Sequence, residues 1–199
     1  MKLTEDSKQK IIAVSIRLSS KNLSPDYYPF FEIPEARKYY MNNLYESLSP
    51  CHLCLDMKQL LNEIIIIWDG SKKGITNFLS YLSKIEKALA NLNDFCKAQK
   101  WSYSIKSHMA LDSGMAQKLI IPPKGNIEAC INWTGMHADR VSSLTNEMQN
   151  GKYPDLLITH SFYEVLPISI QKELTTLYYV RHICCYSFPP KFPKEQLLK

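Results

Sequence analysis

The pattern of apolar and polar positions predicts strands that alternate with helices along most of the chain. Residues 10–18 are short, apolar and rich in β-branched side chains, which is typical of a strand. Residues 63–68 hold four consecutive isoleucines and a tryptophan, and such a continuous apolar run is typical of a central parallel strand covered on both faces. Further strands are predicted at 101–109, 126–133 and 155–158.

Helices are predicted between these strands. Residues 34–49 begin with Pro34 and Glu35, which both suit the first turn of a helix, and a second helical segment follows to about Leu61. Residues 75–100 carry apolar side chains every three or four positions, the spacing of an amphipathic helix. Two further helices are predicted at 137–148 and 168–180.

This order of elements predicts an α/β fold with a mainly parallel sheet flanked by helices on both faces. Strands separated by helices normally pair in parallel through right-handed crossovers. Ligands of such sheets gather beyond the carboxyl ends of the strands. The length of 199 residues fits a single domain spanning 1–199 with a sizeable core.

Composition narrows the class of protein. Apolar residues make up 45% and charged residues 22% of the chain, as in ordinary globular proteins. No apolar run approaches the roughly 20 residues of a membrane span, and no secretory signal is visible, so we expect a cytoplasmic protein. The net charge of +5 comes from scattered lysines without a clustered basic face, which argues against nucleic acid as a partner.

The six cysteines are expected to be reduced thiols. Cys51 and Cys54 have the spacing of zinc ligands, and His182 and Cys184 could supply the remaining two. The second pair lies about 130 residues away and does not repeat the spacing, so we disfavour zinc and favour buried thiols.

The strongest candidate for chemistry follows the isoleucine-rich strand. Asp69 would act as the catalytic residue and bind Mg²⁺ held on a diphosphate, because a carboxylate at the end of a buried strand can ligate that ion. The backbone and cationic groups of the next residues would cradle the phosphates; these residues are Gly70, Ser71, Lys72 and Lys73. The alternative is a turn in which an aspartate caps the helix and the lysines are solvated.

Polar residues after two other strands are candidates for the same cleft. Asn132 ends one predicted strand, and His160 and Ser161 follow another. The alternative for Asn132 is a simple strand-to-helix turn. A hydrolase triad is not supported, because neighbouring side chains such as His160 and Ser161 point to opposite sides of a strand.

Several segments of the C-terminal part resemble the cis-prenyltransferases, the family of undecaprenyl diphosphate synthase. The similar segments are Gly125–Gly135, Tyr153–Ile158, Thr176–Tyr179 and Phe188–Phe192, within residues 125–199. Ile64–Gly70 also looks like the strand and motif that carry the family's catalytic aspartate. The resemblance implies a parallel sheet, a dimer, Mg²⁺ and a prenyl diphosphate substrate. If Ile64–Gly70 corresponds to the family's first strand, residues 1–60 are an addition to the family's fold. If residues 10–18 correspond to that first strand instead, no aspartate stands at its end.

Departures from the family leave three functional hypotheses. The segment Thr159–Tyr163 stands where the family has Arg-Thr-Ser-Gly-Glu, so the arginines that hold isopentenyl diphosphate there are absent. The first hypothesis is a divergent prenyl-diphosphate transferase or processing enzyme, a homodimer or a heteromer with a homologue, that contacts membranes peripherally. The second is a non-catalytic prenyltransferase-like partner subunit or binding module. The third is an unrelated α/β enzyme acting on a phosphorylated small molecule.

Overall fold

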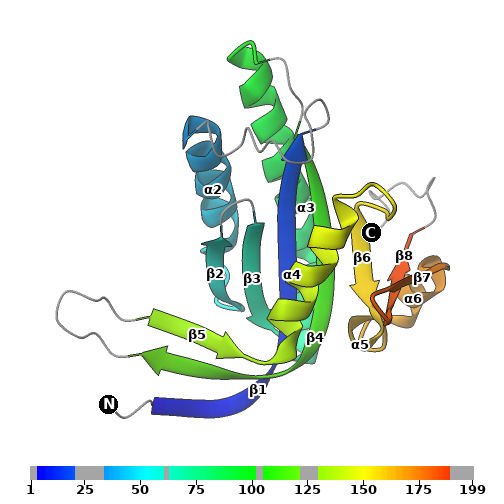
Figure 1. The fold of residues 1–199 in the computed structure, drawn as a ribbon. Coiled ribbons are helices and arrows are strands. Elements are labelled where there is room, and N and C mark those ends of the chain that lie inside the picture. Colours follow the sequence, from blue (N-terminus) through cyan, green and yellow to red (C-terminus); the bar gives the residue numbers. More distant parts are fainter. Residues whose placement is uncertain (1–3, 21–33, 61–62, 102–104, 122–129, 189–199) are drawn as a thin grey trace.

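All eight strands of the described residues belong to one sheet (Figure 1). The computed structural model describes residues 4–20, 34–60, 63–101, 105–121 and 130–188. The strands are β1 (Thr4–Ser20), β2 (Cys54–Leu60), β3 (Glu63–Asp69), β4 (Ile105–Ile121), β5 (Cys130–Thr134), β6 (Leu156–Thr159), β7 (Thr176–Val180) and β8 (Ile183–Ser187). The helices are α2 (Pro34–Leu48), α3 (Lys72–Ala98), α4 (Met136–Met148), α5 (His160–Tyr163) and α6 (Ile168–Glu173).

The sheet is mostly antiparallel, so the prediction of a mainly parallel sheet is wrong. Its strand order is β2-β3-β1-β4-β6-β8-β7, with β5 paired to β4, and among the described strands the β4–β6 pair alone is parallel. The cause lies in residues 54–60, which were predicted to be helical but form β2. Because β2 forms a hairpin with β3, it reverses the chain, and β3 runs antiparallel to β1. Helix α3 does connect two strands of equal direction, β3 and β4, but β1 lies between them.

The second wrong element is the predicted helix at 168–180. Only α6 is helical there, and the chain continues as the antiparallel hairpin β7–β8. Arg181 and His182 form its two-residue turn with φ of 45° and 69°. Two successive left-handed residues are the geometry of a type I′ turn, which normally uses Asn and Gly. The hairpin therefore lacked its usual sequence signal.

Other elements confirm the sequence predictions. The helices at 34–49, 75–100 and 137–148 and the strands at 63–68 and 155–158 are present with small shifts of their ends. The strand at 10–18 lies within the longer β1, and the strand at 101–109 overlaps only the start of β4, which begins at Ile105. Residues 102–104, and residues 126–129 of another predicted strand, lie outside the described residues. Within the described chain, no helix is long and apolar enough to cross a membrane.

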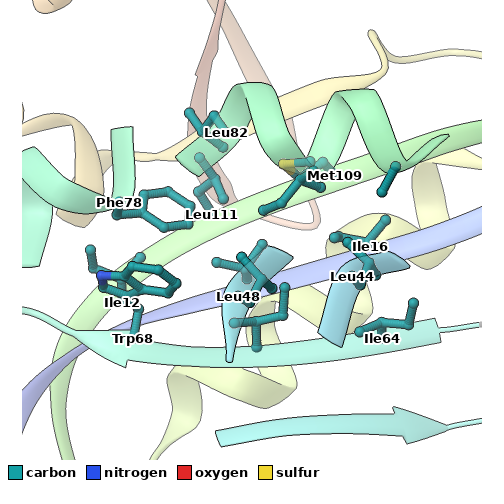
Figure 2. Packing of buried hydrophobic residues seen from close by; sticks show 14 of the residues in the cluster. Ile12, Ile16, Leu44, Leu48, Ile64, Trp68, Phe78, Leu82, Met109 and Leu111 are labelled. Atoms are coloured by element: carbon teal, nitrogen blue, oxygen red, sulfur yellow. The ribbon is translucent and has the colours of Figure 1, made fainter. Parts of the chain in front are cut away.

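Alternation along the central strands separates two faces of the sheet. Ile12, Val14 and Ile16 of β1 pack on one face with α2 and α3, where Trp68 and Phe78 meet edge to face (Figure 2). The intervening residues of β1 face α4 on the opposite side. Since α4 contacts mainly β1 and β4, the part of this face formed by β2 and β3 is less covered. We call this side the α4 face.

Candidate functional site

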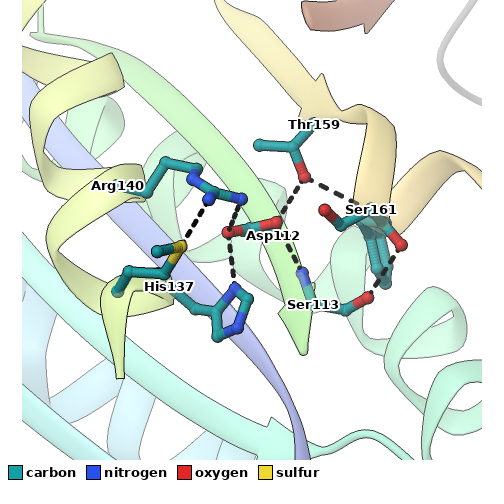
Figure 3. A network of polar contacts seen from close by, with 8 residues as sticks. Asp112, Ser113, His137, Arg140, Thr159 and Ser161 are labelled. Atoms are coloured by element: carbon teal, nitrogen blue, oxygen red, sulfur yellow. Dashed lines mark hydrogen bonds and ion pairs between the residues drawn. The ribbon is translucent and has the colours of Figure 1, made fainter. Parts of the chain in front are cut away.

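A buried carboxylate on β4 anchors α4 to the sheet (Figure 3). The Asp112 side chain is 0% exposed, and both of its oxygens accept hydrogen bonds. Oδ1 accepts from Thr159 Oγ1 at 2.5 Å and from the Ser113 backbone N–H at 2.9 Å. Oδ2 accepts from His137 Nδ1 at 2.8 Å and from Arg140 Nη1 at 3.1 Å. The donors lie on β4, β6 and the start of α4, so one carboxylate ties three elements together.

The His137 ring reaches Asp112 by crossing over a glycine. A Cβ atom placed on Gly114 of β4 would lie 2.1 Å from His137 Cε1 and Nε2. Any side chain at this position would therefore displace the ring, and glycine permits the close approach of α4 to β4.

A second buried carboxylate, that of Glu63 on β3, contacts α4 one turn further along the helix. Glu63 is 4% exposed. Its Oε1 accepts from Ser15 Oγ at 2.5 Å and Thr145 Oγ1 at 3.4 Å, and its Oε2 accepts from Arg17 Nη2 at 3.0 Å and Ser142 Oγ at 2.8 Å. Like Asp112, this carboxylate has protein donors on both oxygens. Both groups thus serve to position α4 on the sheet.

A pocket opens beside α4, where the helix leaves β2 and β3 uncovered. Its volume is about 170 Å³, and its walls come from β2, β3, β5 and α4. Ile65 and Ile67 of β3 give it an apolar side. The polar or aromatic residues of its walls are Asp56, Lys58, Asn132, Trp133, Asp139 and Ser142.

Two buried polar atoms of residues that line this pocket have no hydrogen-bond partner among the described residues. They are the indole N–H of Trp133 and Oδ2 of Asp56. Lys58 Nζ lies 3.5 Å from that Asp56 oxygen and donates to Asn132 Oδ1 at 3.5 Å. Because buried polar atoms are normally hydrogen-bonded, the Trp133 N–H indicates an acceptor supplied by a polar ligand, whereas the Asp56 oxygen already has an ion-pair contact with Lys58.

The acidic residues suit a metal ion that binds together with the phosphates of a ligand better than a metal ion held by protein side chains alone. Within the described ranges, no group of three His, Cys, Asp or Glu side chains is placed to hold a metal. Glu63 and Asp112 are already hydrogen-bonded by the protein, whereas Asp139 is an exposed carboxylate on the pocket wall. Mg²⁺ commonly uses one or two carboxylates together with substrate phosphates.

The predicted Asp69 site forms the start of α3. Asp69 Oδ1 accepts from the Ser71 backbone N–H at 2.9 Å, and Oδ2 accepts from Ser71 Oγ at 2.8 Å. Ser71 Oγ in turn accepts from the Gly74 N–H at 3.1 Å, so it caps the helix. Lys72 and Lys73 are exposed in the first turn. The lysines are solvated, as the turn alternative expected, but the helix is capped by Ser71 rather than by Asp69, and the metal and phosphate roles of this segment remain predictions.

The predicted site residues do not all gather at one place. Asn132 lies in the pocket, which none of the other predicted residues lines. Gly70 donates its N–H to the Lys10 carbonyl of β1 at 2.9 Å. His160 and Ser161 lie in α5, where His160 Nδ1 is 3.0 Å from Tyr186 Oη and the Ser161 carbonyl accepts from a serine of β4.

The four residues weighed as zinc ligands lie at opposite edges of the sheet. Cys51 and Cys54 precede or begin β2, at one end of the strand order. His182 and Cys184 belong to the β7–β8 hairpin at the other end. The structure therefore separates the two pairs.

The fold is similar to that of solved nucleotidyl cyclase domains. The adenylyl cyclase CyaB from P. aeruginosa matches with a TM-score of 0.68 and 12% identity, over 98% of this chain and 99% of that one. The guanylyl cyclase Cya2 matches with a TM-score of 0.67 and 8% identity, over 95% and 98%. The guanylate cyclase domain of RhGC from Catenaria anguillulae, solved in complex with GTP, matches with a TM-score of 0.52 and 12% identity, over 91% and 97%. No family model and no curated protein matches the sequence.

These findings overturn the resemblance to cis-prenyltransferases. The structural neighbours are cyclase domains, and the sheet is mostly antiparallel. The matched segments were short: 153–158 includes most of the four-residue strand β6, and 176–179 belongs to the hairpin strand β7. Prenyl-diphosphate transfer and a prenyl diphosphate substrate are therefore wrong. The other two hypotheses, a prenyltransferase-like partner subunit and an unrelated α/β enzyme, do not match the neighbours either.

Sequence reasoning missed most of the pocket and both buried carboxylates. Asp56 and Lys58 were hidden because β2 was predicted as helix. Asp112 had one usable signal, since it is a charged residue directly after the apolar run Met109–Leu111.

Proposed function

We propose that this chain is a nucleotidyl cyclase-type domain that acts on a nucleoside triphosphate. The observation that carries the proposal is the pocket beside α4, where the Trp133 N–H has no hydrogen-bond partner among the described residues and an Asp56 oxygen is paired with Lys58 at 3.5 Å. The edge of a nucleobase presents hydrogen-bond acceptors and donors side by side, and its flat ring suits the apolar contact offered by Ile65 and Ile67.

The pocket's size supports a base rather than a whole nucleotide. Pockets that enclose drug-sized ligands usually measure roughly 300–1,000 Å³, whereas this one measures about 170 Å³. The ribose and phosphates would therefore lie outside it. The fold supports the same class of ligand, because a neighbour of matching architecture was solved with GTP.

The proposed reaction joins the ribose 3′-hydroxyl to the α-phosphorus and releases pyrophosphate. A bound Mg²⁺ would neutralise charge on the phosphates. Asp139, exposed on the pocket wall, would hold this ion, and Asp56 would accept a donor of the base. Lys58, beside Asp56, would supply positive charge and a donor at the pocket.

The test is a product assay on the purified full chain. Each of ATP, GTP, CTP and UTP is incubated with Mg²⁺ or Mn²⁺, and cyclic nucleotide and pyrophosphate are quantified by mass spectrometry and a coupled assay. Nucleotide binding, measured by calorimetry, should be about tenfold weaker in Asp56→Asn and in Trp133→Phe, because each variant loses one buried hydrogen bond to the ligand. Asp94→Asn is the matched control, since Asp94 lies exposed on α3, away from the pocket, where it forms a surface ion pair with Lys97. Equal binding by all variants would refute the pocket assignment.

A second candidate is a domain of the same fold that binds a nucleotide without turning it over. It is favoured by Glu63 and Asp112, because these two buried carboxylates are occupied by protein donors rather than open to a metal. Calorimetric binding of a triphosphate with no cyclic product under any metal would select this candidate. Product formation would select the enzyme.

A further inference from the structure

We infer that Cys51 and Cys54 form a reversible disulfide with each other when the chain meets a glutathione disulfide. Both are free thiols in the structure. They occupy the ends of a tight turn, in which the Cys54 backbone N–H donates to the Cys51 carbonyl at 3.0 Å. Such a turn keeps its end Cα atoms within about 7 Å, and disulfides span roughly 4.4–6.8 Å between Cα atoms. The turn thus brings the two backbone positions into the range that a disulfide spans.

Cys51 and Cys54 also interact electrostatically. Burial raises the pKa of Cys54 to about 11, and the neighbouring Cys51 thiol adds to the rise. Cys51 Sγ donates to Asn77 Oδ1 at 3.0 Å, and the crosslink would break this hydrogen bond. Cys54 is the more accessible of the two, because Cys51 is buried and Cys54 is partly exposed.

The other described cysteines are not placed for the same reaction. Cys184 and Cys185 are adjacent on β8, and neighbouring side chains of a strand point to opposite faces. Cys96 is buried in the last turns of α3. The Cys51–Cys54 pair is therefore the site that the fold favours among the described thiols.

The reaction proceeds in two balanced exchanges. Cys54 first loses its proton to solvent, a step that its raised pKa makes slow at neutral pH, and its thiolate attacks one sulfur of glutathione disulfide so that a glutathione thiolate leaves. Cys51 then loses its proton to solvent and attacks the Cys54 sulfur of the mixed disulfide, which releases the second glutathione. The protein loses two hydrogen atoms, and one glutathione disulfide becomes two glutathione thiols. Strand β2 begins at Cys54 and carries Asp56 and Lys58, so the crosslink forms at the first residue of a strand that lines the pocket.

The experiment is a redox titration of the full chain that does not involve nucleotide. The protein is equilibrated anaerobically in glutathione buffers of increasing oxidised fraction, quenched with acid, alkylated with iodoacetamide and mapped by peptide mass spectrometry. We expect the peptide with both cysteines to lose two hydrogens and both alkylation sites, reversibly on return to reduced buffer.

Single variants separate closure from simple modification. In Cys51→Ser, Cys54 should accumulate a glutathione adduct that the wild type does not retain, whereas Cys96→Ser should behave as the wild type. The inference is overturned if both cysteines remain alkylated at the most oxidising ratio, or if the wild type retains the glutathione adduct instead of closing. The wild-type peptide map decides even if a variant fails to fold.

Discussion

Replacing Asp112 by Asn should destabilise the fold strongly, because one atom of the side chain would change from acceptor to donor. Four donors converge on the two Asp112 oxygens at 2.5–3.1 Å. An Asn amide must turn its NH₂ group toward either the Arg140–His137 pair or the Ser113–Thr159 pair. A buried donor without an acceptor costs about 1–3 kcal/mol, and a buried charge that loses its partner costs about 3–5 kcal/mol. The Arg140 side chain is 23% exposed, so we discount the charge and expect a loss of about 3 kcal/mol.

The assay is urea unfolding of the wild type, Asp112→Asn, Arg140→Gln and the double variant, with the m-values compared first. If the carboxylate and the guanidinium act as one unit, the double variant should lose at least about 1 kcal/mol less than the sum of the single losses. Asp139→Asn is the matched control on the exposed side of the same helix turn, and it should change stability by no more than about 0.5 kcal/mol. A loss below about 1 kcal/mol for Asp112→Asn, or strictly additive variants, would refute the anchoring role.

Three further predictions concern the same framework. His182→Gly should raise the unfolding free energy by about 0.5–1 kcal/mol, because His182 has φ of 69° in the β7–β8 turn, and a melting temperature that falls would contradict this. Gly114→Ala should lower the free energy by about 1–3 kcal/mol in urea, because the new methyl group would push the His137 ring from its place, and an unchanged midpoint would contradict it. Burial raises the pKa of the Cys185 thiol to about 12, so its contribution to stability is complete below the ordinary thiol pKa of about 8.5 and is lost as the pH rises above it. The unfolding free energy from urea curves should therefore fall more steeply between pH 8 and 10.5 for the wild type than for Cys185→Val. Equal slopes of this free energy against pH would refute the assignment.

Local pattern predicted the central elements well because their burial is decided by periodicity. Helix α3 buries the residues that recur at three- and four-residue spacing, and all of β3 except Asp69 is buried as its apolar run indicated. Direction was not predictable in the same way. Residues 54–60 alternate weakly, with none of them fully buried, so nothing in their composition distinguished strand from helix. That single element decides whether β3 runs parallel or antiparallel to β1, and the error spread from it to the whole sheet.

The candidate site was less predictable because its residues meet only through the tertiary fold. Asp112 contacts His137 and Thr159, which lie 25 and 47 residues away, and no local spacing connects them. The rule that ligands gather at the carboxyl ends of strands does not apply to this sheet for a physical reason: it assumes parallel strands whose ends meet at one edge, and antiparallel pairing places alternate ends at opposite edges. In such a sheet the sequence still indicates a site where a charged residue lies within an otherwise apolar strand, because the desolvation of that residue must be compensated by partners elsewhere in the chain. Asp112, on a strand whose neighbouring Ala110 and Leu111 are fully buried, meets that condition, and its partners identify the helix that forms one wall of the pocket.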